Sequence, residues 1–366
     1  MKYVQKNPLP IPQSGALESV RSTIDAIFDW RYALEKQELL SLYEKGKAQS
    51  WNASDLDWSV DVDLERMVAE RGDGTWRMLT EVMAPPMHLD ERQIFQMQLH
   101  TNTFMLSQFL HGEQGALLAT AKLVQQIPSA EAKFYAANQV ADEARHVEVY
   151  HRYLTEKIGI SYPVHPSLNT LLDDIMKDSR WDVTFLGMQI MVEGLALAAF
   201  GMIRMLLPNE SLIQDITARI MGDEARHVAF GVLALGDLYR SELSEAELRE
   251  REEFIVEATY LLHERLVARP VYERLGWDVE RWTEWSLRTP FMRGFRQMMF
   301  SKIVPNLKRL GLLRPRVRAA FEKLDLLRFE HAKDSVEEVG ITPPEELVQL
   351  LLKYLAQPAP TPIVGA

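Results

Sequence analysis

Asp-Glu-Ala-Arg-His-Val, at residues 142–147, is repeated without change at residues 223–228. Both copies lie in the middle of long segments with the apolar spacing of a helix, where side chains are often buried. Glu143 and His146 are three residues apart and share one helix face, as do Glu224 and His227. A carboxylate and an imidazole on one face supply half of the ligands of a metal site. The repeat therefore predicts two matched half-sites.

Each half-site has a further glutamate on the preceding helix. Glu113 lies thirty residues before Glu143, and Glu193 lies thirty-one residues before Glu224. Both stand in apolar surroundings, where a lone carboxylate is rarely buried unless it is paired or bound to a metal. The nearly equal spacing is what two helical hairpins related by a pseudo-two-fold axis would have. We therefore predict that all six residues bind metal.

The ligand types indicate which metals the site takes. Four carboxylates and two imidazoles favour iron or manganese over structural zinc. Asp142 and Asp223 are expected to accept the free N–H of a ligand histidine, each on the other hairpin, although the sequence does not pair them. Arg145 and Arg226 would balance these aspartates. The alternative is a purely structural network of buried ion pairs.

The chain is predicted to be all-α. Helices are expected at 16–45, 64–83, 90–126, 130–158, 167–179, 183–206, 210–239 and 245–267, with shorter helices beyond Pro270. Prolines fall at the joints, where helices end. Long helices with short joints predict a four-helix bundle. We expect N-terminal helices and a connector over 1–89, the bundle over 90–240, C-terminal helices packed on it over 241–356, and a loose tail over 357–366.

Composition excludes several classes of function. The 366 residues include no cysteine, which rules out disulfides, thiolate metal sites and cysteine nucleophiles. A net charge of −11 disfavours nucleic acid as a partner. No signal peptide and no membrane-spanning run is recognised, so a cytoplasmic protein is expected.

The six predicted ligands resemble those of the ferritin-like superfamily of di-iron carboxylate proteins. There, a glutamate from each of two helices joins a Glu-x-x-His pair from each of two others. The resemblance covers roughly residues 90–240. It is greatest to the oxygen-activating branch: monooxygenase hydroxylases, ribonucleotide reductase small subunits with their ligand-binding oxidase relatives, and arylamine N-oxygenases. It implies a ferritin-like bundle with flanking helices, and two iron ions, with a manganese–iron pair as the alternative.

Two positions of this sequence differ from the pattern of two of these groups, and a third position matches the pattern of the remaining group. Leu197 stands where monooxygenase hydroxylases usually carry a threonine, and Ile220 stands where arylamine N-oxygenases carry a seventh ligand, a histidine. Tyr150 occupies the position of the radical tyrosine of ribonucleotide reductase subunits. It is a candidate catalytic residue, and the alternative is a buried tyrosine with a hydrogen-bonded hydroxyl.

The expected function is an oxidase or monooxygenase that uses dioxygen to oxidise a hydrophobic small organic molecule. Radical generation and iron oxidation are the alternatives. The resemblance also implies an electron donor such as a ferredoxin or flavin reductase, and a homodimer. One turn from the ligands we expect a substrate cavity, lined by Phe109, Ala116, Leu117, Gln139, Gln189, Leu197, Phe200 and Ile220. Most of these side chains are apolar, which favours an apolar substrate.

Overall fold

The computed structural model describes residues 18–63, 84–207 and 209–337, and every regular element within these ranges is helical. The predicted all-α class is therefore confirmed. The predicted helix at 64–83 and the predicted tail at 357–366 lie outside the described residues, as does the end of the predicted C-terminal region beyond residue 337.

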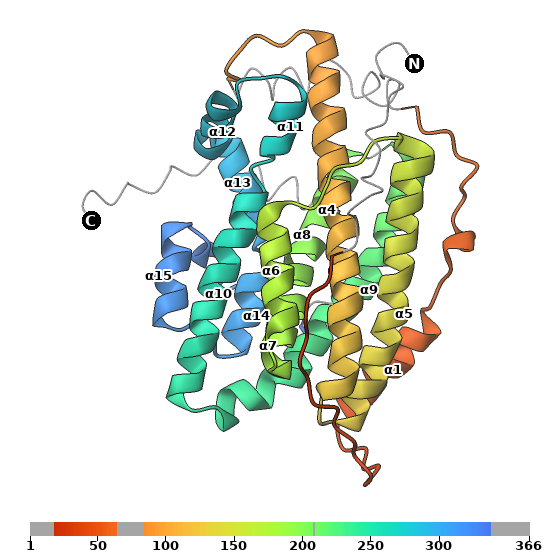
Figure 1. The fold of residues 1–366 in the computed structure, drawn as a ribbon, viewed down its shortest axis with the longest axis vertical. Helices are drawn as coiled ribbons and strands as arrows, with labels where there is room; N and C mark the ends of the chain where they lie inside the picture. Colours follow the sequence, from red (N-terminus) through yellow and green to blue (C-terminus); the bar gives the residue numbers. More distant parts are fainter. Residues whose placement is uncertain (1–17, 64–83, 208, 338–366) are drawn as a thin grey trace.

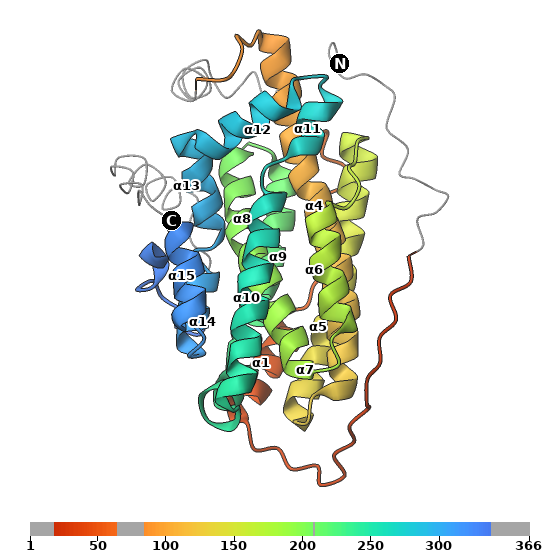
Figure 2. The ribbon, with the colours of Figure 1, turned by 60° about the vertical axis from the view of Figure 1, so that its left-hand side comes forward.

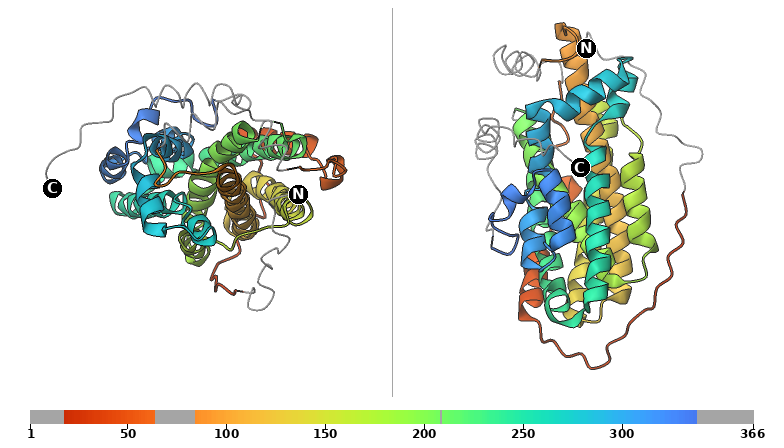
Figure 3. Two further views of the ribbon diagram at one scale, coloured as in Figure 1. Left: turned by 90° about the horizontal axis from the view of Figure 1, so that it is seen from above. Right: turned by 90° about the vertical axis from the view of Figure 1, so that its left-hand side faces the viewer.

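Four helices that run side by side along the longest axis form the bundle (Figures 1 and 3). They are α4 (Glu91–Gln126), α5 (Ala130–Arg152), α8 (Glu193–Leu206) and α9 (Ser211–Asp237). The joint between α4 and α5 and the joint between α8 and α9 are only a few residues long, so each pair is an antiparallel hairpin. The bundle expected from the sequence is thus confirmed.

Side-chain caps fix where the bundle helices begin. Asp90 accepts a hydrogen bond from the Gln93 amide at the start of α4, and Ser129 accepts one from Ala132 at the start of α5. At the start of α9, Glu210 accepts from the amides of Leu212 and Ile213. Each cap satisfies an amide that has no partner within its helix.

The helix that carries Glu193 is not regular. It begins as α7 (Trp181–Phe185), continues as a π-helical segment, η3 (Leu186–Val192), and becomes α8 at Glu193 itself. π-Helical turns add a residue and are frequent at functional sites. Gly231 of α9 faces this segment, and a Cβ there would lie 2.8 Å from Cβ of Gln189. Only glycine therefore permits this close approach.

Two further π-helical segments end bundle helices: η2 (Tyr153–Ile158) follows α5, and η4 (Leu238–Glu242) follows α9. The remaining elements flank the bundle (Figure 2). They are α1 (Gln37–Ala48), η1 (Ala53–Asp55), α6 (Pro166–Lys177), α10 (Glu245–Arg265), α11 (Arg269–Arg274), α12 (Val279–Arg288), α13 (Pro290–Met299), α14 (Ile303–Arg309), α15 (Pro315–Lys323) and η5 (Leu327–Phe329).

The flanking helices pack directly on the bundle. α1 contacts α5 and α9, α10 contacts α6 and η3, and α13 contacts α8. One apolar core runs through both the bundle and these helices, from Leu39 to Phe329. The division of the chain into regions at residues 89, 240 and 356 stays a prediction.

The helix predicted at 16–45 is wrong for residues 18–36, which form no helix and lie outside the bundle (Figure 2). The amide of Ile27 donates to the Gln125 carbonyl, and the amides of Glu35 and Lys36 donate to the Glu131 carboxylate. These three backbone amides thus donate to acceptors on α4 and α5 and not to acceptors within a helix of their own. The large side chains of Phe28, Trp30 and Tyr32 are exposed, so they add nothing to the core.

The continuous helix Trp181–Arg204 is long and apolar enough to cross a membrane, which the sequence analysis did not anticipate. However, 94% of its apolar window is buried inside the bundle. It also begins near a buried aspartate, Asp182, and contains Glu193. These properties identify it as the core helix of the fold.

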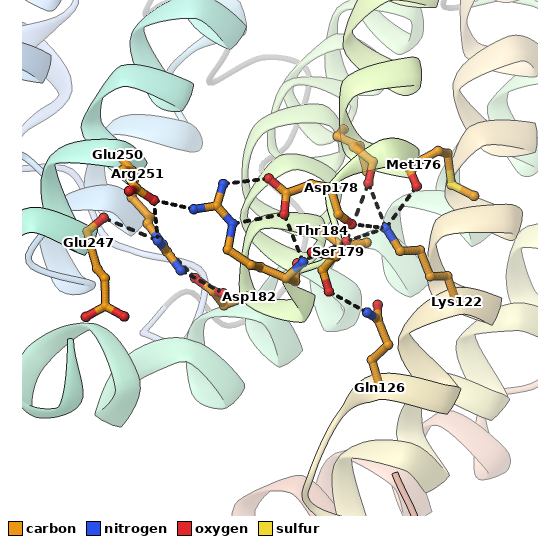
Figure 4. A network of polar contacts seen from close by, with 12 residues as sticks. Lys122, Gln126, Met176, Asp178, Ser179, Asp182, Thr184, Glu247, Glu250 and Arg251 are labelled. Atoms are coloured by element: carbon orange, nitrogen blue, oxygen red, sulfur yellow. Dashed lines mark hydrogen bonds and ion pairs between the residues drawn. The ribbon is translucent and has the colours of Figure 1, made fainter. Parts of the chain in front are cut away.

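A buried lysine closes the C-terminal end of α6 (Figure 4). The Lys122 ammonium group donates to the carbonyl oxygens of Ile175 and Met176, at 3.0 and 3.1 Å, and to that of Asp178. Carbonyl groups in the last turn of a helix lack partners within the helix, so a cation from α4 satisfies them. This contact fastens α6 to the bundle.

Candidate metal centre

The six predicted ligands come from all four bundle helices and meet in the core. Glu113 projects from α4, Glu143 and His146 from α5, Glu193 from α8, and Glu224 and His227 from α9. Glu113 is 4% exposed, Glu193 is 2% exposed, and the other four side chains are fully buried. The fold therefore gathers four carboxylates and two imidazoles in a space that excludes water.

The ligand atoms form two overlapping groups. Oxygen and nitrogen atoms of Glu113, Glu143, His146 and Glu224 lie within 4.8 Å of one another, and those of Glu143, Glu193 and His227 form a second such group. The Glu143 carboxylate belongs to both. Nδ1 of His146 lies 3.3 Å from one of its oxygens, and Nδ1 of His227 lies 3.1 Å from the other. This arrangement fits two neighbouring metal ions.

The opposite edge of each imidazole faces an aspartate from the other hairpin. Nε2 of His146 is 3.1 Å from Asp223, and Nε2 of His227 is 3.2 Å from Asp142. Asp142 pairs with Arg145, and Asp223 with Arg226. A carboxylate at Nε2 keeps the proton on that nitrogen and leaves Nδ1 free to bind a metal.

Trp51, from the segment after α1, adds a further hydrogen bond to the pair formed by Asp223 and His146. Its indole N–H donates to Asp223 at 2.7 Å, so a buried hydrogen-bonded chain runs from Trp51 through Asp223 to His146. Trp51 falls in the region of N-terminal helices and connector expected over 1–89, for which no functional role was predicted. Only packing over more than 170 residues of chain brings the indole to the aspartate.

The cluster lacks the partners that buried polar atoms normally have. Within the described residues, Oε2 of Glu143, Oε2 of Glu193 and both carboxylate oxygens of Glu224 accept no hydrogen bond, and neither does Nδ1 of His227. Unpartnered buried polar atoms are costly and uncommon in native proteins. Here they converge on one space, and they are the atom types that bind iron and manganese. The residues present therefore fit a dinuclear metal site.

Without a cation, the site competes for protons. Burial raises the pKa of Glu113, and the Glu224 carboxylate raises it further. Burial and the same neighbour raise the pKa of Glu193. Burial alone would lower the pKa of the histidines, but the hydrogen bonds of His146 to Asp223 and Glu113, and the charge of Glu143 beside His227, raise both pKa values. Bound metal would replace these protons.

Gln139, expected in the substrate cavity, lies against the ligands instead. Its Nε2 donates to Oε1 of Glu143 and to Oε1 of Glu193, both at 2.9 Å. Gln189 donates to Thr120 at 3.3 Å, and its carbonyl oxygen has no partner in the described residues. Gln139 thus positions two carboxylates, one from each hairpin.

Tyr150 is fully buried between Phe109 and Phe200, whose rings lie 5.9 and 6.0 Å from its own. Its hydroxyl makes no hydrogen bond within the described residues, which differs from the buried, hydrogen-bonded tyrosine considered above. Burial raises its pKa, and the Glu113 carboxylate raises it further. The phenol is therefore neutral and lies beside the metal cluster.

An apolar pocket of about 120 Å³ lies beyond this aromatic group, between α4, α8 and the C-terminal helices. Phe109 lines it, and Phe109 is one helical turn from Glu113. The other predicted cavity residues do not line this pocket. Ala116, Leu197, Phe200 and Ile220 are packed into the core, and Leu117 is partly exposed. Their assignment to a substrate cavity beside the ligands stays a prediction.

Comparison with known proteins is consistent with this fold. No family model matches the chain. The crystal structure of dimanganese(II)-NrdF from Streptococcus sanguinis is 16% identical, covers 80% of this chain and 98% of its own, and superposes with a TM-score of 0.50. A variant R2-like ligand-binding oxidase with a reconstituted Mn/Fe cofactor is 18% identical, covers 79% and 98%, and has a TM-score of 0.47.

The resemblance to the ferritin-like superfamily is thus confirmed at the level of the fold, by the match to the dimanganese protein and by the helix arrangement described above. The buried cluster of carboxylates and imidazoles is consistent with it.

Proposed function

We propose that this chain is a dinuclear iron oxidoreductase that uses dioxygen to oxidise an apolar small organic molecule. The observation that carries the proposal is the position of Phe109. Its ring lines the apolar pocket, contacts Phe200 with ring centres 4.7 Å apart, and stands one turn before Glu113. Phe109 therefore belongs both to the wall of the pocket and to the aromatic group beside the ligand cluster.

In this proposal Glu113, Glu143, His146, Glu193, Glu224 and His227 are the metal ligands. Iron is favoured, and a manganese–iron pair is the alternative. The bound ions would supply the electrons and the positive charge needed to reduce dioxygen. Asp142 and Asp223 hold the two imidazoles in the metal-binding tautomer, and Gln139 orients two carboxylates. The apolar surroundings exclude water, which protects reactive species from side reactions.

Continuous turnover would require an external electron donor, for which a ferredoxin or a flavin reductase is the proposed class. A homodimer and a cytoplasmic location are also part of this proposal. The hydrogen-bonded chain from Trp51 through Asp223 to His146 supports this proposal, because it would offer a route for electron entry.

The test is oxygen consumption by protein loaded anaerobically with ferrous iron and then mixed with oxygenated buffer. We expect rapid oxygen uptake that depends on iron and accelerates with an apolar organic substrate. His146→Ala should abolish it. His151→Ala is the matched control, because His151 lies on α5, as His146 does, but is exposed and should be dispensable. No oxygen uptake by wild-type protein carrying two ions would contradict the proposal.

Radical generation is a second candidate, favoured by Tyr150, whose unpartnered hydroxyl lies beside the cluster. After oxygen exposure, a tyrosyl radical in the electron paramagnetic resonance spectrum that disappears in Tyr150→Phe would support it. Full substrate oxidation by Tyr150→Phe would exclude it. Iron uptake well beyond two ions per chain would instead support iron oxidation and storage.

A further inference from the structure

The apolar pocket contains one charged side chain in its wall. Its walls are mainly apolar and include methionine, phenylalanine and leucine side chains from α4, α8 and α13, such as Met105, Met202 and Phe295. Arg265, in the last turn of α10, lines the same space and is only 5% exposed. A guanidinium group in such a wall is unusual, because burying an unpaired charge is strongly unfavourable.

Arg265 has no partner within the described residues. It makes no hydrogen bond or ion pair there, and its Nη1 is buried without an acceptor. The other buried arginines within the described residues have hydrogen-bond partners. Arg251, on the same helix, donates to both oxygens of Asp182 at 2.9 and 3.0 Å, and Arg296 donates to the carbonyls of Ser286 and Leu287. The lack of a partner therefore distinguishes Arg265 from its neighbours.

A second unpartnered polar group lines the same pocket. Gln98 of α4 is 4% exposed, and neither its amide nitrogen nor its carbonyl oxygen has a partner in the described residues. The nearest acidic neighbour in sequence, Glu264, accepts a hydrogen bond from Ser167. Burial lowers the pKa of Arg265 to about 10, so the guanidinium remains charged at neutral pH. The pocket thus offers hydrogen-bond donors and a positive charge, and no anionic group within the described residues pairs with them.

We propose that this pocket binds an apolar organic acid, with the carboxylate held by Arg265 and Gln98 and the hydrocarbon part against Phe109. A carboxylate accepts two hydrogen bonds from a guanidinium in a geometry that few other groups match. The apolar walls select the rest of the molecule. Because Phe109 lies toward the metal cluster, an acid anchored in this way has its apolar part nearest to the metals.

That this acid is the substrate rests on the proposed function, whereas its binding does not. Binding is therefore measured by calorimetry on the full chain without metal, with octanoate and its neutral counterpart octan-1-ol as probes. We expect octanoate to bind more tightly than octan-1-ol. In Arg265→Gln, octanoate should bind at least about tenfold more weakly, while octan-1-ol should be unaffected.

Arg269→Gln is the matched control, because Arg269 is half exposed, pairs with Glu280 and does not line the pocket. Circular dichroism would establish that each variant is folded, and Gln98→Leu should weaken octanoate binding in a second, independent way. Equal affinity of wild type for the acid and the alcohol would overturn the proposal, as would equal octanoate affinity in wild type and Arg265→Gln. Failure of the loaded protein to consume oxygen would count against the proposed function alone.

Discussion

The charged groups at the end of α6 and those of the metal centre are comparably buried, but only in the metal centre do buried carboxylate oxygens lack a hydrogen-bond donor within the described residues. Lys122 donates to three carbonyl oxygens and to Thr184, and Asp182 is paired with Arg251 (Figure 4). In the metal centre, carboxylate oxygens of Glu143, Glu193 and Glu224 accept nothing within the described residues. Burial of charge alone does not identify a functional site in this protein, whereas missing partners do.

The largest effect that we expect from this comparison is on stability. Lys122→Ala would leave buried carbonyl oxygens of α6 without a donor and should lower the free energy of unfolding by about 3 kcal/mol. In metal-free protein, Glu193→Gln should lower it little or raise it, because it removes one of four crowded carboxyl groups. Urea denaturation measures both. If Glu193→Gln cost as much as Lys122→Ala, the metal cluster would be an ordinary structural network.

The next effect concerns metal affinity. Asp223→Asn should weaken metal binding by about 10–100-fold, because His146 loses the carboxylate that fixes its tautomer. Competition with a chromophoric chelator measures the affinity. Asp215→Asn on the same helix is the control, since Asp215 is half exposed and pairs with Arg219. Unchanged affinity in Asp223→Asn would remove the aspartate from the site.

A smaller effect is a pH dependence that separates the metal-free and metal-loaded proteins. The pKa values of Glu113, Glu193, His146 and His227 are raised in the folded, metal-free chain. Groups with raised pKa values stabilise the fold at low pH, and this contribution is lost as pH rises. The metal-free protein should therefore lose stability between about pH 5 and 8, whereas bound metal displaces the protons.

It follows that the rise in Tm caused by metal should be larger at about pH 8 than at about pH 5.5. Differential scanning calorimetry of both forms at the two pH values tests this. A rise that is equal at both values, or larger at the lower one, would contradict the assignment of these residues as ligands.

The smallest effect that we expect is on the free energy of unfolding of variants at the two buried arginines of α10. Arg251→Gln leaves the buried carboxylate of Asp182 without its guanidinium partner and should destabilise the protein by about 2 kcal/mol. Arg265→Gln removes a charge without a partner and should change the free energy of unfolding by less than about 0.5 kcal/mol, or raise it. Thermal unfolding of the ligand-free variants distinguishes the two. A large loss for Arg265→Gln would indicate a structural role for that side chain.

The bundle and its cluster could be predicted because their signals are local. The three-residue spacing of Glu143 and His146 is enough to place them on one helix face, and the second copy of the hexapeptide has the same spacing. The cross-hairpin contacts of Asp142 and Asp223 also follow from the two-fold repetition of the motif. These features need only the helix repeat and the chemistry of the side chains.

The remaining features depend on packing between distant segments. Residues 18–36 carry helix-like apolar spacing, yet their amides are taken by Gln125 and Glu131 of the bundle. Of the eight residues expected in a substrate cavity, only Phe109 lines the apolar pocket, whose other walls include residues from α10 to α13. Arg265 resembles any charged residue at a helix C-terminus until the structure shows that it has no partner. No local pattern carries this information.

The central claim is tested most directly by anaerobic titration of the full chain with ferrous iron, with bound metal determined by elemental analysis. The account predicts two tightly bound ions per chain in wild type and in His151→Ala, and fewer than two in His146→Ala. Two ions per chain in His146→Ala, or no tight binding in wild type, would contradict it.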